Sequence, residues 1–174
     1  MQSDRLAGEF RPELLSRRGE FVAWGLALVV TATWVILRLY GQGVSIAVPL
    51  LDAFLLFSAL SISLGNWMDR RTVIRLDPET ITFGNGLRHA VMRWNEIKQV
   101  QVFPTNWGKK VRVLGSRAHF EFRTLAEIKV QDEVKGRMGF VEGESILQNI
   151  IRSADLIEKP GEDTQPGVYY YAHE

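Results

Sequence analysis

Two long apolar stretches lie near the start of the chain, and they predict two helices of transmembrane length. Residues 21–40 carry Arg38 near their end, and residues 44–64 carry Asp52 as their single charge. A helix that spans a bilayer needs about 20 mostly apolar residues, so both stretches qualify. Only a short segment around Gly-Gln-Gly separates them. We therefore expect a two-helix transmembrane hairpin over residues 21–64.

Arginines gather on the two flanks of the predicted hairpin that lie away from the Gly-Gln-Gly segment. The seven arginines on these flanks are Arg5, Arg11, Arg17, Arg18, Arg70, Arg71 and Arg75, whereas Arg38 alone lies near the connection. Lys and Arg accumulate on the cytoplasmic side of membrane proteins. The pattern predicts a protein of the cell (inner) membrane with two spans and with both termini in the cytoplasm.

Residues 1–20 predict a charged cytoplasmic arm rather than a cleaved signal peptide. The apolar run begins late, lacks a small-residue cleavage site and is followed by a second apolar run, which favours an anchor. Within the arm, Pro12 is followed by ELLSRR. Proline is favoured in the first turn of a helix, so this segment predicts a short helix that begins at Pro12.

After residue 65 the apolar spacing changes from helical to alternating, which predicts strands. Alternating or apolar segments recur at residues 72–76, 81–83, 98–103, 111–114 and 119–123. Asn85-Gly86 is typical of a hairpin turn. Short strands separated by turns indicate an antiparallel meander that curls or closes. Helical spacing returns over residues 143–158 and predicts one amphipathic helix that caps the strands. Residues 65–159 are thus expected to form one cytoplasmic domain.

The last residues, 160–174, are polar and acidic and end in an aromatic run, Tyr169, Tyr170 and Tyr171. This composition predicts a flexible tail. Two hypotheses remain for the tyrosines. They form a docking peptide that adds a strand or aromatic anchors to a partner, or they belong to a disordered end without a partner.

Asp52 is the residue of the hairpin that an anchor does not need. A carboxylate near a helix centre costs about 2.5–3.5 kcal/mol on the insertion scale, yet the Leu, Ile, Val and Phe residues around it return about 4–7 kcal/mol. A hairpin that turns near Gln42 places Asp52 level with Thr31–Thr33. Asp52 is then a hydrogen-bonding group inside the hairpin, a contact for a partner membrane subunit, or part of a proton or ion pathway. Ala59 and Ser63 form a small-residue stripe suited to close helix contact.

The predicted domain over residues 65–159 has a small basic surplus, 16 Lys and Arg against 12 Asp and Glu. This surplus is far below that of a nucleic-acid-binding domain, but it is compatible with an anionic membrane surface. The side chains that would contact lipid are Arg70, Arg71, Trp107, Lys109, Lys110 and Arg112. The alternative is a solvated hairpin whose charges aid only solubility.

The residues give no pattern typical of catalysis or of metal binding. The chain contains no cysteine, which excludes thiolate chemistry and cysteine metal sites. His89, His119 and His173 lie far apart, and their spacing does not indicate a metal site. The hydroxyl residues lack a nucleophile-elbow pattern, and the glycines lie in turns. We expect no enzyme activity, no cofactor, no metal and no small-molecule substrate.

The run over residues 72–102 joins an apolar strand, an Asp-Pro-Glu turn and a second strand to Trp94-x-x-Ile97-x-x-Val100. This run resembles bacterial pleckstrin-homology-like (PH-like) domains, many of which follow two transmembrane helices. The resemblance covers about residues 44–158. It implies an antiparallel β-barrel or sandwich capped by a C-terminal helix, and a role in binding or scaffolding. The first strand connection is acidic here, in contrast to phosphoinositide-binding relatives.

The sequence therefore predicts an α+β membrane protein without enzyme activity. Its hairpin and its domain would bind or help to assemble another integral membrane protein or a second copy of the chain. The residues expected to contact that partner are Asp52, Ala59, Ser63, Tyr169, Tyr170 and Tyr171. The alternative function is a membrane-surface module that binds anionic lipid headgroups through its basic face.

Overall fold

The computed structural model describes residues 8–14, 16–106, 108–130, 133–159 and 168–174. The chain divides into two compact units. One unit, the helical hairpin, comprises Ser16–Met68. The other, the sheet unit, combines the residues up to Leu15 with Asp69–Glu174. The chain therefore leaves the sheet unit once, to form the hairpin, and then returns to it.

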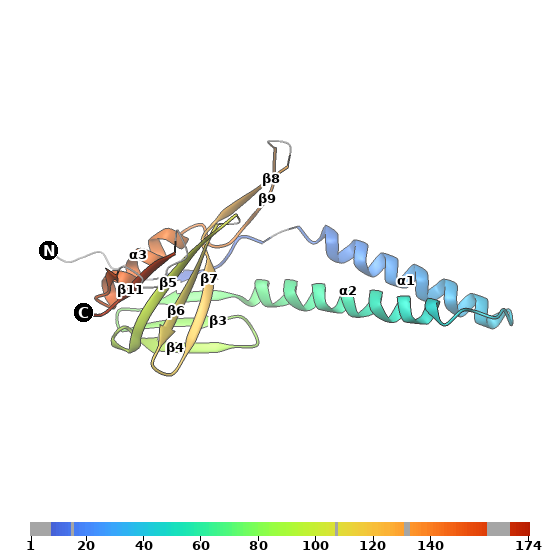
Figure 1. Ribbon diagram of the computed structural model, residues 1–174, viewed down its shortest axis with the longest axis horizontal. Coiled ribbons are helices and arrows are strands. Elements are labelled where there is room, and N and C mark those ends of the chain that lie inside the picture. The colour runs from blue at the N-terminus through green and yellow to red at the C-terminus, as the bar shows by residue number, and fades with distance from the viewer. Residues whose placement is uncertain (1–7, 15, 107, 131–132, 160–167) are drawn as a thin grey trace. The chain divides into compact units, whose positions relative to one another are not determined.

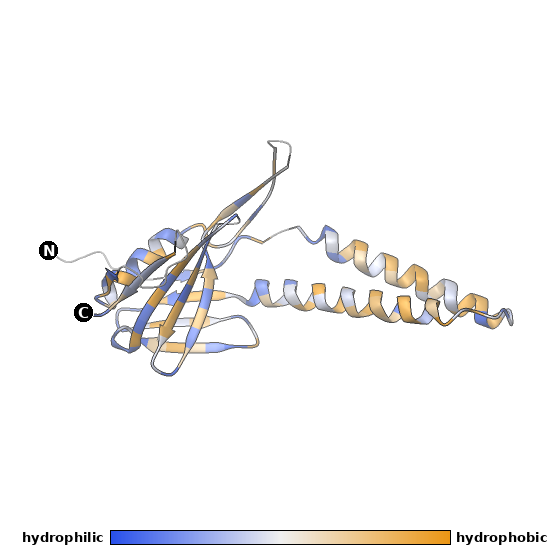
Figure 2. Ribbon diagram, viewed as in Figure 1, coloured by the Kyte–Doolittle hydropathy of each residue, from blue (hydrophilic) through white to orange (hydrophobic). Residues whose placement is uncertain are grey.

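The two predicted helices are confirmed, and both are longer than the apolar stretches that predicted them. Helix α1 comprises Arg18–Leu39 and helix α2 comprises Ala47–Arg71 (Figure 1). Both are long and apolar enough to span a membrane. Only 11% of each spanning window is buried, whereas the core helix of a soluble protein is mostly buried. Figure 2 shows apolar residues over most of both helices.

The first sheet of the sheet unit is built from both flanks of the hairpin. Its four antiparallel strands are β1 (Gly8–Phe10), β2 (Val73–Leu76), β3 (Thr80–Gly84) and β4 (His89–Arg93), in that order. Strand β1, which precedes α1, pairs with β2, which follows α2. The short helix predicted from Pro12 is wrong, because Glu13 instead forms an antiparallel bridge with Gly139. The arm is extended because Phe10 packs on the core and Glu9 is paired with Arg75 at 2.5 Å.

The second sheet has five strands in the order β10-β11-β5-β6-β7, and a third contains only β8 and β9. The bounds are β5 Ile97–Thr105, β6 Gly108–Gly115, β7 His119–Arg123, β8 Ala126–Val130, β9 Glu133–Met138, β10 Ile157–Lys159 and β11 Tyr169–Ala172. The predicted α+β class with antiparallel sheets is confirmed. Within the described residues no sheet is closed into a barrel, because β4 and β7 each end a sheet without pairing to one another.

The predicted flexible tail is wrong for the described residues 168–174. Strand β11 lies between β10 and β5, with Tyr170 opposite Gln101 and Tyr171 opposite Val100. Tyr171 packs against the core, and the imidazole of His173 bonds the carbonyl of Ile97 at 2.8 Å. The aromatic segment does add a strand, as the docking hypothesis supposed, but it adds it to its own sheet. The remainder of that segment, 160–167, lies outside the described residues.

Helix α3 confirms the predicted amphipathic helix but is shorter than expected. It comprises Gly143–Ser153 rather than residues 143–158. Asp155 has a φ of 51°, a left-handed conformation that stops the helix, and the chain then enters β10. Ile157, expected on the apolar face of the helix, is 43% exposed in that strand instead.

One hydrophobic core joins the first two sheets and α3. The Phe83 ring of β3 stacks on the Phe120 ring of β7 with 5.0 Å between centroids. Helix α3 contributes Ile146 and Ile150, both fully buried. Each such side chain is worth about 1.5–3 kcal/mol relative to exposure in water. A 3-10 turn, η1 (Trp94–Glu96), lies between β4 and β5.

Candidate functional site

The carboxyl group of Asp52 faces the opposite helix of the hairpin. Asp52, in the middle of α2, is only 5% exposed, and its Oδ1 lies 2.6 Å from the Thr31 Oγ1 of α1. The Thr31 hydroxyl also lies 2.9 Å from the carbonyl of Ala27. A hydroxyl has one proton to donate, so it serves one acceptor at a time. The predicted level of Asp52 with Thr31 is confirmed, and the carboxyl group is directed into the hairpin.

A second polar cluster joins the helices at the end away from their connection. Glu20 is 7% exposed and accepts hydrogen bonds from Arg17 at 3.0 and 3.1 Å, from Ser63 at 2.9 Å and from Asn66 at 2.9 Å. The Trp24 indole in turn donates to the Ser63 hydroxyl at 2.8 Å. This network satisfies a buried carboxylate with several donors, as a group in a low-dielectric environment requires.

Sequence reasoning missed this second cluster, because Glu20 was counted only among the charges of the arm. The spacing of Arg17 and Glu20, three residues apart at the start of a helix, was an available signal for an ion pair. The hydrogen bonds from Ser63 and Asn66 could not be predicted from the residues near Glu20, since both donors lie on the other helix.

Three hydroxyl groups on the outward faces of the hairpin bond to their own helix. Thr33 and Ser61 are exposed and Ser58 is half-buried, and each donates to the carbonyl four residues earlier at 2.8 Å. In lipid there is no water to satisfy a polar group, so such groups need a partner within the protein. These outward hydroxyls therefore meet the requirement of an apolar solvent.

Trp34 differs from the other polar groups of the hairpin. Its indole nitrogen is buried, and within the part of the chain that the structure describes it has no hydrogen-bond partner. The Asp52 carboxyl group is instead bonded by Thr31, whose Oγ1 lies 2.6 Å from the Asp52 Oδ1. Trp34 is thus a buried donor at a position of close helix contact.

The residues expected to contact a partner are mostly engaged within the chain. Asp52 and Ala59 are buried between the helices, and Ser63 takes part in the Glu20 cluster. Tyr169 and Tyr171 lie in strand β11 of the sheet unit. The structure thus does not gather these residues into one surface. Asp52, Ala59 and Ser63 lie in the hairpin, whereas the tyrosines lie in β11 of the sheet unit, where Tyr169 is 47% exposed.

The predicted basic face is largely neutralised. Lys109 pairs with Glu144 at 2.9 Å, while Lys110 and Arg112 both pair with Glu121 at 2.6 Å. Burial raises the pKa of Glu121, but the hydrogen bonds from Lys110 and Arg112 outweigh it and hold that pKa below its ordinary value. These three cations already have anionic partners. Trp107, expected beside them, lies outside the described residues.

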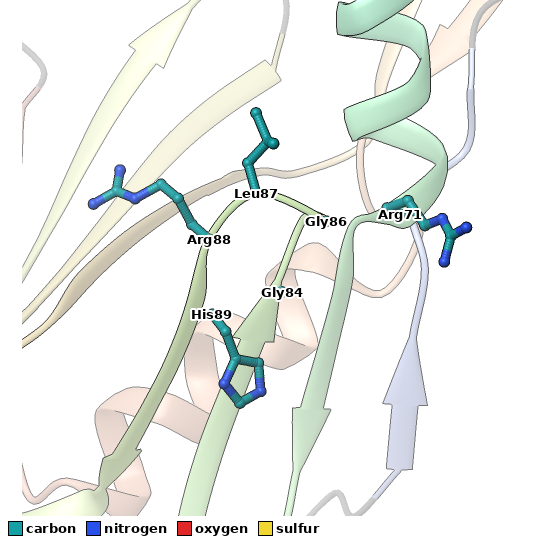
Figure 3. A pocket seen from close by; sticks show the side chains of 6 residues that line it. All are labelled: Arg71, Gly84, Gly86, Leu87, Arg88 and His89. Carbon is teal, nitrogen blue, oxygen red and sulfur yellow. The ribbon is translucent and has the colours of Figure 1, made fainter.

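Arg70 and Arg71 lie in the last turn of α2, which belongs to the sheet unit. Arg71 borders a cavity of about 350 Å³ whose lining residues are Arg71, Gly84, Gly86, Leu87, Arg88 and His89. In Figure 3 the guanidinium groups of Arg71 and Arg88 point in opposite directions. They do not converge on a common point, so the geometry does not resemble a cradle for a single small anion.

The three histidines remain separate in space. The Arg88 guanidinium lies 3.1 Å from His119, His173 bonds the Ile97 carbonyl, and His89 borders the cavity. Across the described ranges no group of three or more His, Cys, Asp or Glu side chains is arranged to hold a metal ion.

Comparisons of the chain with protein-family models, with curated proteins and with solved structures found no match. The PH-like resemblance accordingly rests on the strand pattern, the Trp94 turn and the order of hairpin and domain.

Proposed function

We propose that the chain is an integral protein of the bacterial cell membrane that acts, without enzyme activity, as a binding or assembly subunit for another membrane protein. The pairing of β1 with β2 is the observation that carries this proposal. The sheet unit receives strands from both ends of the hairpin, which supports a topology with both ends on the same side of the bilayer. The arginine-rich flanks favour the cytoplasm as that side.

Insertion of the hairpin is supported by which residues are exposed. Large apolar side chains such as Phe21, Phe54 and Phe57 are each more than 60% exposed, at 68%, 65% and 71%. Asp52 and Glu20 are buried and bonded. Water as the surrounding solvent would favour the reverse arrangement, whereas lipid favours this one.

The join between hairpin and sheet unit is short enough to restrict the domain. Only Thr72 separates the end of α2 from the start of β2. This short connection supports a sheet unit that is tethered close to the end of the hairpin along the chain. A binding domain held in this way meets partners in the same membrane at a high effective concentration.

Strand β4 offers a surface for such a partner. It ends the first sheet, so one side of its backbone is unpaired within the described residues. Its outward side chains are His89, Val91 and Arg93, and Val91 is 51% exposed. An exposed edge strand is a common site of strand addition by a partner. This surface supports a role in protein binding.

Copurification in mild detergent after crosslinking of intact membranes tests the proposal. We expect a membrane protein, or a second copy of this chain, to copurify with the full-length protein, and Val91→Lys to reduce its recovery. Val141→Lys is the matched control, because Val141 is also 51% exposed but lies outside β4. A chain that is strictly monomeric, with no crosslinked protein, contradicts the proposed function.

A further inference from the structure

The turn between β3 and β4 lies at the end of the first sheet where α2 joins it. Val73, two residues after the end of α2, pairs with Gly84, and Gly84 pairs with His89. The turn over residues 85–88 therefore extends past Val73, beside the last turn of α2. The shared lining of one cavity by Arg71, Leu87 and Arg88 agrees with this register.

The turn has a defined conformation. The Asn85 Oδ1 accepts hydrogen bonds from the backbone N–H groups of Leu87 at 3.2 Å and Arg88 at 2.8 Å. Gly86 adopts a φ of 82°, which glycine tolerates without strain. The side chains that follow are thus held at fixed positions on the tip.

Leu87 is the apolar residue of this tip, and it is 61% exposed. Figure 3 shows its side chain directed outward from the turn, with the Arg88 side chain extending to one side and Arg71 to the other. An exposed leucine between two arginines suits the boundary between lipid headgroups and acyl chains. The leucine enters the apolar layer there, and the guanidinium groups bond lipid phosphates.

The turn at the opposite end of β3 is acidic, although Arg93 of β4 lies opposite Thr80 at this end. The turn between β2 and β3 carries Asp77 and Glu79, both exposed. The five residues of β3 separate the two turns by about 17 Å. An anionic bilayer attracts the arginine end and repels the acidic end, which orients the strands with the β3–β4 turn toward the membrane.

We propose that the β3–β4 turn is a membrane-contact tip, in which Leu87 inserts at the headgroup boundary while Arg71 and Arg88 bind the phosphates of anionic lipids. This inference rests on the proposed function, since it requires α2 to leave the bilayer near Arg71. It assigns lipid contact to a surface other than the predicted cluster of Lys109, Lys110 and Arg112.

Site-directed fluorescence on the full-length protein in lipid nanodiscs tests the tip. The chain has no cysteine, so single cysteines can be labelled without altering other positions. Environment-sensitive probes are placed at Leu87→Cys in the tip, at Glu79→Cys in the acidic turn and at Phe57→Cys in the middle of α2. The discs contain phosphatidylcholine with or without phosphatidylglycerol, and lipids spin-labelled at the headgroup or in the acyl chain serve as quenchers.

We expect headgroup quenching of the probe at position 87 and none at position 79, with acyl-chain quenching at position 57. If position 57 is quenched but position 87 is not, the tip proposal is wrong while the membrane hairpin stands. If position 57 is not quenched, the proposed insertion itself fails. A blue shift at position 87 without headgroup quenching assigns the tip to a protein contact and overturns the lipid assignment.

Two double variants, each of which removes two positive charges, test the role of the arginines. In the Leu87→Cys protein, Arg71→Gln with Arg88→Gln should reduce quenching in anionic discs to its value in neutral discs, with a loss of about fivefold in the contact equilibrium per arginine. Lys109→Gln with Lys110→Gln removes the same charge from the ion-paired face and should leave quenching unchanged. Equal effects of the two double variants would show that the contact depends only on net charge, and this result would contradict the tip proposal.

Discussion

The hairpin and the sheet unit bury opposite kinds of residue. In the sheet unit the fully buried side chains are large and apolar, Phe120, Ile74 and Ile81 among them. In the hairpin the buried residues of the helices are small or polar, namely Ala27, Ala59, Glu20 and Asp52. The large apolar side chains of the hairpin are exposed. With the hairpin inserted in lipid as we propose, both arrangements follow one rule, that polar groups need partners and apolar groups avoid water.

The comparison also separates two ways of holding elements together. Burial of apolar area drives association of the sheets with α3, and it is strong but not directional. In the proposed lipid environment of the helices that driving force is lost, so close packing at alanines and directed hydrogen bonds would replace it. The Thr31–Asp52 bond and the Glu20 cluster therefore fix the register of the two helices rather than provide large stability.

The largest expected difference comes from removing one aromatic ring in each region. Phe120→Ala deletes a ring that stacks on Phe83 in the core and should lower the free energy of unfolding by about 3–5 kcal/mol. Phe57→Ala removes a ring that is 71% exposed and should change it by less than about 0.5 kcal/mol. Denaturation in micelles measures both. Similar losses would contradict the assignment of opposite solvents.

Replacing one glycine by alanine in each unit compares how tightly the two units are packed around the added methyl group. A Cβ on Gly143 would lie 2.7 Å from the Thr124 Cα, so Gly143→Ala should destabilise the sheet unit by about 1–3 kcal/mol. Gly25 in α1 has nothing within 4 Å of such a Cβ, and Gly25→Ala should stabilise the helix by about 0.8–1 kcal/mol. Thermal unfolding followed by circular dichroism distinguishes them. A stabilising Gly143→Ala would show that the contact with Thr124 relaxes freely.

The hydrogen bond in the middle of the hairpin should be worth little. A double-mutant cycle of Thr31→Val and Asp52→Asn should give a coupling of about 0.6 kcal/mol, the average for bonds between membrane helices. Partner recovery should not change with Asp52→Asn, because the group faces Thr31. Loss of the partner in that variant, with the hairpin intact, would instead place Asp52 at an interface.

The smallest expected effect is a pH dependence in the sheet unit. The pKa of Glu121 lies below its ordinary value in the folded protein. Glu121 therefore adds stability that is complete above about pH 4.5 and is lost as the pH falls through the folded pKa. The group is 34% exposed, so the loss should be only a few tenths of a kcal/mol. Melting temperatures of the protein and of Glu121→Gln, compared above and below that pH, measure it. If the melting temperatures of both proteins changed equally with pH, Glu121 would not be the cause of the pH dependence.

The candidate site was predictable where it depended on spacing along one helix or across a simple hairpin. The level of Asp52 with Thr31 followed from helix rise and the position of the turn. The Glu20 cluster did not, because it depends on how the far ends of two helices of unequal length come together. The neutralised basic face was also unpredictable, since Glu121 pairs across strands with Arg112 and reaches Lys110 as well.

The two apolar helices, the alternating strands, the turn at Asn85-Gly86 and the amphipathic α3 can be predicted from local patterns, because periodicity and turn chemistry act over a few residues. The pairing of β1 with β2 across the whole hairpin and the position of β11 between β10 and β5 follow only from the folded arrangement. Within the described residues, the position of β4 and β7 at the ends of their sheets likewise follows only from the folded arrangement. Backbone hydrogen bonds between distant strands depend on which edges the fold leaves available, and no local pattern encodes that choice.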